Sequence, residues 1–327
     1  MKTLILNQDE IKELLTIKEC VDAVRDAYVS FNSGQVIQPP IASIDVPNHH
    51  GEMDFKFGYA IKEDIIGIKM AGGFWDNPKN YNLPSGVAII VLFDAKNGIP
   101  LCILDGTLIT SYRTAAAGTL AATLLAKEDS KTVCVIGTGA QARMQIIALS
   151  QFFNIKKVKV WGINDVQEYV TYMRDICKNI EFIPCNNAED AVKNSDIIIT
   201  ATASEKAIVM NEWIDEGTHI NAMGCDSPSK QELDPEIFTR TKIINDNKIE
   251  CMKRGDTQHA INKGLISCED IYAEIGELLL GQREGRINNK EITVFDSTGM
   301  SMQDIYTSLL VYKKAIKEKK GKFVSVI

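Results

Sequence analysis

A short glycine motif between an apolar strand pattern and a helix pattern constrains the fold of this chain most. Residues 133–136 are Val-Cys-Val-Ile, and Gly137-Thr-Gly139-Ala-Gln-Ala142 follows them. The spacing G-x-G-x-x-A between a strand and a helix is typical of a dinucleotide-binding βαβ unit. Gly137 permits the tight turn, Gly139 lets the backbone approach a pyrophosphate, and Ala142 allows close helix packing. The helix N-terminus then offers N–H groups to the phosphates.

Strand and helix patterns alternate from residue 131 onward. We predict strands at 132–136, 157–161, 197–201, 218–223 and 242–245, and helices at 140–153 and 167–178. Strands separated by helices of roughly ten to fifteen residues indicate a parallel sheet with right-handed crossovers. The predicted fold class is therefore α/β, with a doubly wound Rossmann sheet.

The two chain ends have a different pattern. Before residue 128 we predict a first helix over 11–28, strands at 65–70 and 87–93, and an Ala-rich helix at 114–126. Near the other end we predict a helix around 271–280, a strand at 292–295 and an amphipathic helix from Asp304. The polar residues near 128 indicate a domain boundary. We therefore expect the Rossmann domain to span residues 129–299.

Composition excludes several classes of protein. The 36 Lys and Arg against 43 Asp and Glu give a net charge of −7, with no basic half. Nucleic acid and anionic membranes are poor partners for such a chain. The run from Thr114 to Ala126 is much shorter than the ~20 apolar residues of a membrane span, and the first residues do not resemble a signal peptide. We expect a cytoplasmic protein.

Metal and redox sites have little support in the sequence. No two of the eight cysteines lie within five residues of each other, and there are four histidines. We therefore expect inert thiols and no metal site. His219 lies in a strand pattern and is expected to be structural, whereas His259 follows a helix start and is a weaker candidate for the functional site.

The choice between NAD and NADP is normally determined just after the second strand of the fingerprint. Here the residues are Trp161-Gly162-Ile163-Asn164-Asp165. No acid directly follows the strand to bind a ribose 2′-hydroxyl, and no arginine is there for a 2′-phosphate. The choice of cofactor stays open.

A second candidate cluster, Ser111-Tyr-Arg113-Thr114, precedes the Ala-rich run. An arginine at the start of a helix can form a forked pair with a carboxylate, while the helix end faces the same anion. A surface salt bridge is the alternative for Arg113. These residues alone leave both open.

Several motifs in order make the chain resemble the ornithine cyclodeaminase/μ-crystallin family. The resemblance covers nearly the whole chain, through Ile68-Lys69, Asn82-Leu-Pro-Ser85, Phe93-Asp94, Gly98-Ile-Pro, Leu108-Ile-Thr, Arg113-Thr-Ala-Ala-Ala, Gly137-Thr-Gly-Ala-Gln-Ala-Arg, Asn221-Ala-Met-Gly-Cys-Asp226-Ser-Pro-Ser-Lys230-Gln-Glu-Leu and Thr293-Val-Phe-Asp-Ser-Thr-Gly299.

The resemblance implies a homodimer with nicotinamide-dependent chemistry on α-amino or α-imino acids. It implies a substrate-binding and dimerisation domain of α+β type, built from residues 1–128 and 300–327. Lys69 and Arg113 would hold the substrate carboxylate, Ser85 would support substrate or cofactor, and Asp226 would face the reacting nitrogen. The alternative for Asp226 is an Asx-turn before Pro228. The expected cofactor contacts are Thr114, Gly137, Gly139, Ala140, Gln141, Gly162, Asn164, Thr202, Met223, Gly224, Phe295 and Ser297.

The chain departs from the family at two places. Many relatives have an arginine near residue 41, where this chain has Pro39-Pro40-Ile41. Cyclodeaminases place a glutamate on the next strand, where this chain has Glu52-Met-Asp54-Phe-Lys56. If Lys56 faces the substrate, the site is strongly cationic, repels the distal ammonium of ornithine and favours a second carboxylate. The alternative is that Lys56 points to water and pairs with Asp54.

Three functions follow from these observations. The first is an NAD(P)H-dependent reductase or dehydrogenase that interconverts an α-imino acid and an α-amino acid, with an iminosuccinate/aspartate pair or alanine as substrate. The second is an ornithine cyclodeaminase, which forms proline and ammonia with a catalytic nicotinamide. The third is a relative that binds a cofactor or ligand without catalysis. Glu52 or Asp54 facing the substrate would favour the second, and Lys56 there would oppose it.

Overall fold

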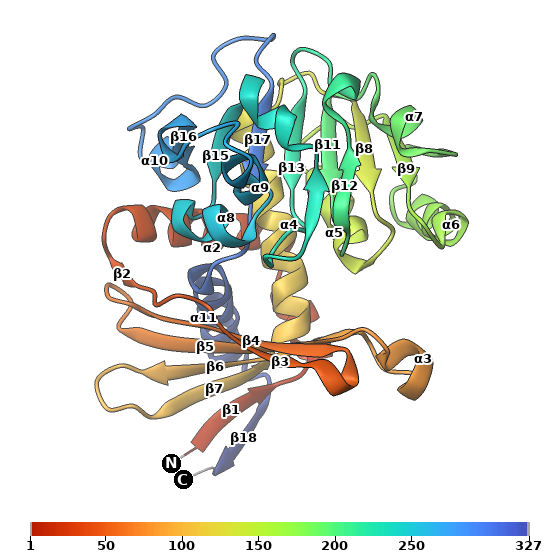
Figure 1. Cartoon of the computed structure of the whole chain (residues 1–327). Helices are drawn as coiled ribbons and strands as arrows, with labels where there is room; N and C mark the ends of the chain where they lie inside the picture. Colours follow the sequence, from red (N-terminus) through yellow and green to blue (C-terminus); the bar gives the residue numbers. More distant parts are fainter. Residues whose placement is uncertain (1, 326–327) are drawn as a thin grey trace. The chain divides into compact units, whose positions relative to one another are not determined.

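The structure is a computed structural model in which residues 2–325 are described. It divides into two compact units (Figure 1). Unit 1 takes the chain up to Arg113 and again from Met300, and unit 2 is Thr114–Gly299. The first division falls inside helix α4 (Gly106–Leu125), earlier than the boundary near residue 128 that the polar residues indicate.

Unit 2 is a parallel sheet in the order β10-β9-β8-β11-β13-β17-β15-β16. Its strands are β8 (Thr132–Ile136), β9 (Lys157–Trp161), β10 (Glu181–Pro184), β11 (Ile197–Thr200), β13 (His219–Ala222), β15 (Lys242–Asn245), β16 (Ile271–Glu274) and β17 (Thr293–Asp296). The central strands are buried along their length, as apolar runs in parallel sheets usually are. This confirms the predicted α/β fold with a Rossmann sheet.

Short helices and one small strand pair complete unit 2. The helices are α5 (Ala140–Leu149), α6 (Val166–Ile176), α7 (Ala188–Val192), α8 (Lys248–Arg254), α9 (Thr257–Asn262) and α10 (Ile275–Leu279). Strands β12 (Glu205–Val209) and β14 (Gln231–Leu233) pair in parallel. Three 3₁₀ turns, η2 (Asn211–Trp213), η3 (Pro235–Arg240) and η4 (Cys268–Asp270), lie between these elements.

The order of strands in unit 2 sets the place for a ligand. The chain runs from β8 to β9 and β10 on one side, and then returns to β11 on the other side of β8. In open α/β sheets, ligands bind at the carboxyl ends of the strands where the order reverses. The fingerprint Gly137–Ala142 follows β8 at this point.

Most predicted elements of unit 2 are confirmed, with one clear error. The six predicted strands lie within one residue of their observed ends, whereas the first helix ends at Leu149 rather than 153. The predicted helix over 271–280 is wrong in its first half, because β16 occupies Ile271–Glu274. There Ile271 pairs with Ile243 of β15, and a capping box between Glu274 and Glu277 starts α10. Sheet pairing overrides the local helix pattern.

Unit 1 is a mixed sheet in the order β18-β1-β7-β6-β5-β4-β2, with β3 on β4. Its strands are β1 (Lys2–Leu6), β2 (Val36–Ile37), β3 (Ala42–Val46), β4 (Gly51–Ala60), β5 (Ile65–Phe74), β6 (Gly86–Asp94), β7 (Pro100–Asp105) and β18 (Lys322–Ser325). Both chain ends meet here, because β1 pairs with β18. A domain built from both ends of the chain was implied by the family resemblance.

Helices cover one face of this sheet. They are α1 (Gln8–Leu14), α2 (Ile17–Asn32) and α11 (Ser301–Glu318); a short α3 (Asn77–Tyr81) and the turn η1 (Pro47–His49) lie in the loops. Helix α11 packs on β4, β5 and β6 and against α2 (Figure 1). The single helix predicted over 11–28 is two helices, since α2 begins after its own cap, Thr16.

Helix α4 corrects the prediction for Arg113. It begins at Gly106, well before Thr114, and the Asp105 carboxylate accepts the Leu108 N–H over 2.7 Å at its start. A Cβ on Gly106 would lie 2.9 Å from the Ala88 carbonyl carbon, so the helix start needs a glycine there. Arg113 is thus inside the helix, and the expectation that a helix start and Arg113 face one anion is wrong.

Candidate functional site

The fingerprint loop in unit 2 has the shape that a pyrophosphate requires. Gly137 has φ +112, and a Cβ there would lie 2.6 Å from the Ala201 carbonyl oxygen. Nothing lies within 4 Å of a Cβ position on Gly139, and no side chain caps α5, which begins at Ala140. Open space in front of an uncapped helix start fits an anionic ligand.

Two buried polar atoms near this loop have no hydrogen-bond partner in the described structure. They are Thr114 Oγ1 and Gln141 Oε1, on residues that the family resemblance places near the phosphates. The neighbouring Gln145 is satisfied, because its Nε2 donates to the Thr114 carbonyl over 3.0 Å. Buried polar atoms are normally paired, so these two fit a site that a bound dinucleotide would complete.

The end of β9 leaves the choice of cofactor open, as the sequence predicts. Thr138 Oγ1 donates to the Asn164 carbonyl over 3.0 Å, and a Cβ on Gly162 would lie 3.0 Å from the Thr138 side chain. The fingerprint loop and this loop are therefore in contact. Ile163 is 85 % exposed, so an apolar side chain stands where many dinucleotide sites have an acid or an arginine.

Unit 1 contains a group of buried charges that we call the cationic cluster: Lys56, Lys69, Arg113 and Asp304. Lys56 of β4 is directly opposite Lys69 of β5, so both side chains lie on the same face of the sheet. Lys69 Nζ is 2.8 Å from Asp304 Oδ2, and Arg113 Nε is 3.0 Å from Asp304 Oδ1. All four side chains are buried. Two strands and two helices thus bring three cations to one carboxylate.

Neighbouring polar groups hold the cluster in place. Arg113 Nη1 donates to Gln303 Oε1 over 3.0 Å, and Gln303 Nε2 donates to the Tyr28 hydroxyl over 2.7 Å. Lys69 Nζ also donates to Thr110 Oγ1 over 3.3 Å. Asp304 and Gln303 were not predicted, although they directly follow the Thr293–Gly299 motif. The available signal was that Asp304, an acidic residue, begins the helix predicted after this motif.

The charged groups of the cluster shift each other's pKa values. Burial, together with the charge of Arg113 and against the attraction of Asp304, lowers the pKa of Lys69 to about 7. Burial alone would raise the pKa of Asp304, but Arg113 and Lys69 outweigh it and hold that pKa below its usual range. Lys69 and Arg113 thus share one ionised carboxylate. Buried charge of one sign is costly unless a counter-ion is bound, so these two cations fit an anionic ligand.

Two alternatives from the sequence are wrong. Lys56 does not point to water, because it is only 6 % exposed. Arg113 is 5 % exposed and bonds to buried groups, so it is not a surface salt-bridge residue.

Ser85 precedes β6, and Gly86 is four residues, roughly 13 Å, from the position opposite Lys69. The structure does not bring Ser85 into the cationic cluster.

Asp226 lies in the loop after β13 in unit 2. Its carboxylate accepts a hydrogen bond from Lys230 Nζ over 2.6 Å, and its carbonyl accepts one from Arg254 Nε over 2.9 Å. The Asp226 side chain is 43 % exposed, unlike the buried acids of the same unit. The Lys230 partner was inside the quoted motif, but its role was not predicted. Asp226 is an accessible carboxylate with a fixed cation beside it.

The other predicted cofactor contacts lie at the carboxyl ends of the unit 2 strands. The Met223 N–H donates to the Thr200 carbonyl over 3.0 Å. The Ser297 hydroxyl donates to Asp246 Oδ2 over 2.8 Å. Phe295 is fully buried within β17. These contacts place Met223 and Ser297 at the edge of the sheet where ligands bind.

The histidines are not part of a metal site in the part of the chain described. His219 is buried between Thr293 Oγ1 (2.9 Å) and Asn221 Oδ1 (3.0 Å), and burial lowers its pKa to about 3. His259 Nε2 donates to the Lys230 carbonyl over 2.7 Å. No group of three His, Cys, Asp or Glu among residues 2–325 is arranged to hold a metal ion. All eight cysteines are free thiols.

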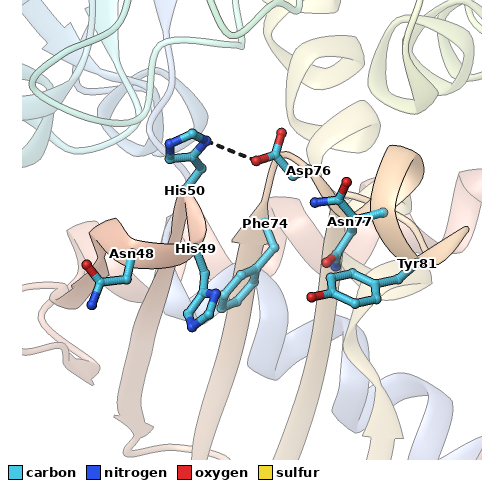
Figure 2. Close-up of a pocket in the computed structure, with 8 residues that line it drawn as sticks. Asn48, His49, His50, Phe74, Asp76, Asn77 and Tyr81 are labelled. Atoms are coloured by element: carbon cyan, nitrogen blue, oxygen red, sulfur yellow. Dashed lines mark hydrogen bonds and ion pairs between the residues drawn. The ribbon is translucent and has the colours of Figure 1, made fainter.

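A separate cavity of about 300 Å³ lies in unit 1, beside the β4–β5 hairpin. His50 Nδ1 lies 2.9 Å from Asp76 Oδ2, a contact drawn as a dashed line in Figure 2. The lining residues are Asn48, His49, His50, Phe74, Asp76, Asn77, Asn80 and Tyr81. None of them is a residue that the sequence singled out.

No helix among residues 2–325 is both long and apolar enough to cross a membrane.

Comparison with known proteins agrees with the fold. The profile of the ornithine cyclodeaminase/mu-crystallin family matches residues 1–319. Alanine dehydrogenase of Archaeoglobus fulgidus is 36 % identical over 323 residues, 98 % of either chain. Iminosuccinate reductase of Paracoccus denitrificans is 31 % identical, over 95 % of this chain and 96 % of the relative. The solved structure of an archaeal alanine dehydrogenase dimer with bound NAD superposes with TM-score 0.94 at 35 % identity, over 100 % of both chains. The chain belongs to the ornithine cyclodeaminase/mu-crystallin family.

Proposed function

We propose that this chain is an NAD(P)-dependent oxidoreductase that interconverts an α-imino acid and an α-amino acid. The observation that carries the proposal is the pair of buried cations, Lys69 and Arg113, that share the single carboxylate of Asp304. A substrate carboxylate would balance that charge and be held in a fixed orientation. The fingerprint loop, with its two unpartnered polar atoms, supports a dinucleotide as the second ligand. An alanine dehydrogenase and an iminosuccinate reductase among the relatives support this class of reaction.

Each residue then has one task. Lys69 and Arg113 bind the substrate carboxylate and so fix the position of Cα. Asp226 stabilises the positive charge of the iminium nitrogen and handles its proton as the amine forms. Gly137, Gly139 and the start of α5 hold the pyrophosphate, with Thr114 and Gln141 as further contacts. The bound reduced dinucleotide supplies the hydride that Cα accepts.

The position of Lys56 favours a dicarboxylic substrate. Lys56 is a third buried cation, on the same face of the sheet as Lys69. Its positive charge would attract a second carboxylate on the substrate, as in an iminosuccinate/aspartate pair. Alanine has no second carboxylate for Lys56 to attract. The charges therefore favour the dicarboxylic acid over alanine.

The same observation argues against ornithine cyclodeamination. That reaction brings a second ammonium to the site, and three cations repel it. Lys56, and not Glu52 or Asp54, is the residue opposite Lys69. A relative that binds ligand without catalysis is also disfavoured, since Lys69, Arg113 and Asp226 are all present.

A homodimer is part of the proposal. The face of the unit 1 sheet opposite Lys56 and Lys69 has apolar residues on β3, β5 and β6: Ile44, Ile66, Val87 and Ile89 are 39–56 % exposed. Exposed apolar patches of this kind commonly mark protein interfaces. The related archaeal alanine dehydrogenase is a dimer. A second copy of the chain is therefore the partner we assign to this face.

The test follows nicotinamide absorbance with purified protein, NADH or NADPH, ammonium and either oxaloacetate or pyruvate. Rapid oxidation with oxaloacetate and slow oxidation with pyruvate would support the dicarboxylic substrate. The reverse order would assign alanine. If neither acid reacts but ornithine yields proline and ammonia with catalytic NAD, the chain is a cyclodeaminase and the proposal is wrong.

A further inference from the structure

Glu232 is a fully buried carboxylate with four hydrogen-bond donors, two for each oxygen. Oε1 accepts the Thr202 N–H over 2.6 Å and the Thr202 hydroxyl over 2.7 Å. Oε2 accepts the Thr200 hydroxyl over 2.7 Å and the Gly224 N–H over 2.9 Å. The side chain is 0 % exposed. Burying a carboxylate costs desolvation free energy, so these four hydrogen bonds must compensate for the lost hydration.

These bonds join two loops at the carboxyl edge of the unit 2 sheet. Thr200 ends β11 and Thr202 follows it, whereas Gly224 follows β13, the next strand in the sheet. A Cβ on Gly224 would lie 2.4 Å from the Thr202 carbonyl oxygen, so the loops are in direct contact. Glu232 thus links the ends of two neighbouring strands where a ligand of this fold binds.

The linked loops contact both the fingerprint and Asp226. A Cβ on Gly137 would lie 2.6 Å from the Ala201 carbonyl oxygen and 3.2 Å from the Thr202 side chain. Asp226 is two residues after Gly224. In this topology the ribose-binding loop after β9 lies on one side of β8, and β11 and β13 lie on the other. The loops that Glu232 holds are therefore on the nicotinamide side.

We propose that Glu232 is a positioning residue that fixes the Thr202 and Gly224 loops against the nicotinamide half of the bound cofactor. The inference rests on the proposed function, because it needs a dinucleotide at the fingerprint. Glu232 itself contacts only protein groups, and it acts through the backbone of Thr202 and Gly224. Its own N–H is held in turn by Asp256 Oδ1 over 2.9 Å.

A carboxylate is the group that this position requires. One backbone N–H donates to each oxygen of Glu232. An NH₂ group in place of either oxygen would therefore face another hydrogen-bond donor. Glu232→Gln keeps the shape and volume of the side chain but loses one backbone bond. A hydrogen bond to a charged group is worth enough to change affinity about tenfold.

Asp196→Asn is the matched control. Asp196 Oδ2 accepts the Lys131 and Thr132 N–H groups over 2.9 and 3.0 Å. Like Glu232, Asp196 accepts hydrogen bonds from backbone N–H groups in unit 2, but it does so at the amino end of β8. Asp196→Asn should lower the melting temperature without changing the affinity for any nucleotide.

The experiment measures the dissociation constants of NADH and ADP-ribose by calorimetry on the full-length protein, with the melting temperature recorded for each variant. ADP-ribose carries the pyrophosphate but lacks nicotinamide. Glu232→Gln should weaken NADH about tenfold and leave ADP-ribose within about twofold. Equal weakening of both ligands, or no change in either, would overturn the proposal. Wild-type protein that binds neither ligand would instead overturn the proposed function.

A second variant keeps the test decisive if Glu232→Gln does not fold. Thr200→Val removes one hydroxyl donor and preserves the shape of the strand end. We expect NADH to weaken about threefold and ADP-ribose to bind as before. If Thr200→Val leaves the ratio of the two dissociation constants unchanged, Glu232 has no positioning role.

Discussion

The two units bury charge in opposite ways. Unit 1 places three basic side chains around Asp304, whereas unit 2 buries several carboxylates, among them Glu232, Asp256 and Asp296. In unit 2 the acids accept bonds mainly from backbone N–H groups and hydroxyls: Asp256 Oδ1 accepts two N–H groups, and Asp296 Oδ2 accepts the Thr257 N–H and hydroxyl.

The pKa values separate the two arrangements. Burial raises the pKa of Asp296 to about 7, and burial together with the charge of Asp296 raises that of Asp256 well above its usual range. The pKa of Asp304 is lowered instead, because cations surround it. The acids of unit 2 are held by hydrogen-bond donors of the surrounding loops, whereas Asp304 is held by basic side chains. The partners of a buried carboxylate therefore distinguish a group that holds loops together from one that belongs to an anion-binding cluster.

Asp226→Ala should have the largest effect, because it removes the acid that we assign to the reacting nitrogen and leaves the buried acids of unit 2. We expect kcat to fall about 10²–10⁴-fold, the usual loss for a proton-handling group. The NADH dissociation constant should stay nearly unchanged, as measured by fluorescence titration. A large loss of NADH affinity would instead show that Asp226 holds loops in place, as the buried acids of unit 2 do. Its assignment to the reacting nitrogen would then be wrong.

Asp304→Asn removes the one carboxylate of the cationic cluster and leaves basic groups facing each other. We expect the free energy of unfolding to fall by about 3 kcal/mol, since one member of a buried ion pair is lost. Urea denaturation gives this value. Asp45→Asn, at an exposed position of β3, is the control and should change little. Equal stability of the two variants would contradict the ion-pair geometry.

Lys56→Met tests whether the third cation selects the substrate. The KM for oxaloacetate should rise about 30-fold, the equivalent of about 2 kcal/mol for an unpaired buried carboxylate. The KM for pyruvate should change little, since it has no second carboxylate. Initial rates with both acids under identical ammonium and NADH concentrations measure the ratio. A parallel rise for both acids would make Lys56 a general carboxylate ligand.

The pH dependence of anion binding is the smallest effect. Burial lowers the pKa of Lys69 to about 7, so its ammonium is charged below that pH and neutral above it. Succinate, which cannot be reduced, should therefore inhibit about fivefold less as the pH rises from 7 to 8. Lys69→Arg keeps its charge and should flatten the profile. A wild-type profile that is already flat would mean that Lys69 stays protonated.

Local patterns predicted most of unit 2 because its central strands β8, β11 and β17 are mostly apolar segments. Two boundaries failed where distant contacts decide the structure. Ile271 becomes a strand residue by pairing with Ile243, and α4 starts at Gly106 because the helix approaches Ala88 closely. Neither contact leaves a signal in the neighbouring sequence.

The same limit applies to the functional residues. Lys69 and Arg113 were found through motifs, whereas Asp304 was missed because it is far from both along the chain and meets them only in the fold. Whether Lys56 faced the substrate depended on the register of β4 with β5, which alternation alone does not specify. Glu232 was quoted within a motif, but its four donors come from other loops.

Lys56 stands on a strand whose place is fixed by main-chain bonds to β5. Replacing its side chain leaves those bonds untouched, so the framework tolerates exchange at this position. A single substitution at residue 56 could therefore change which substrate acid is preferred, while the protein still folds. The sheet of this chain can therefore keep its register while the charge presented at residue 56 changes.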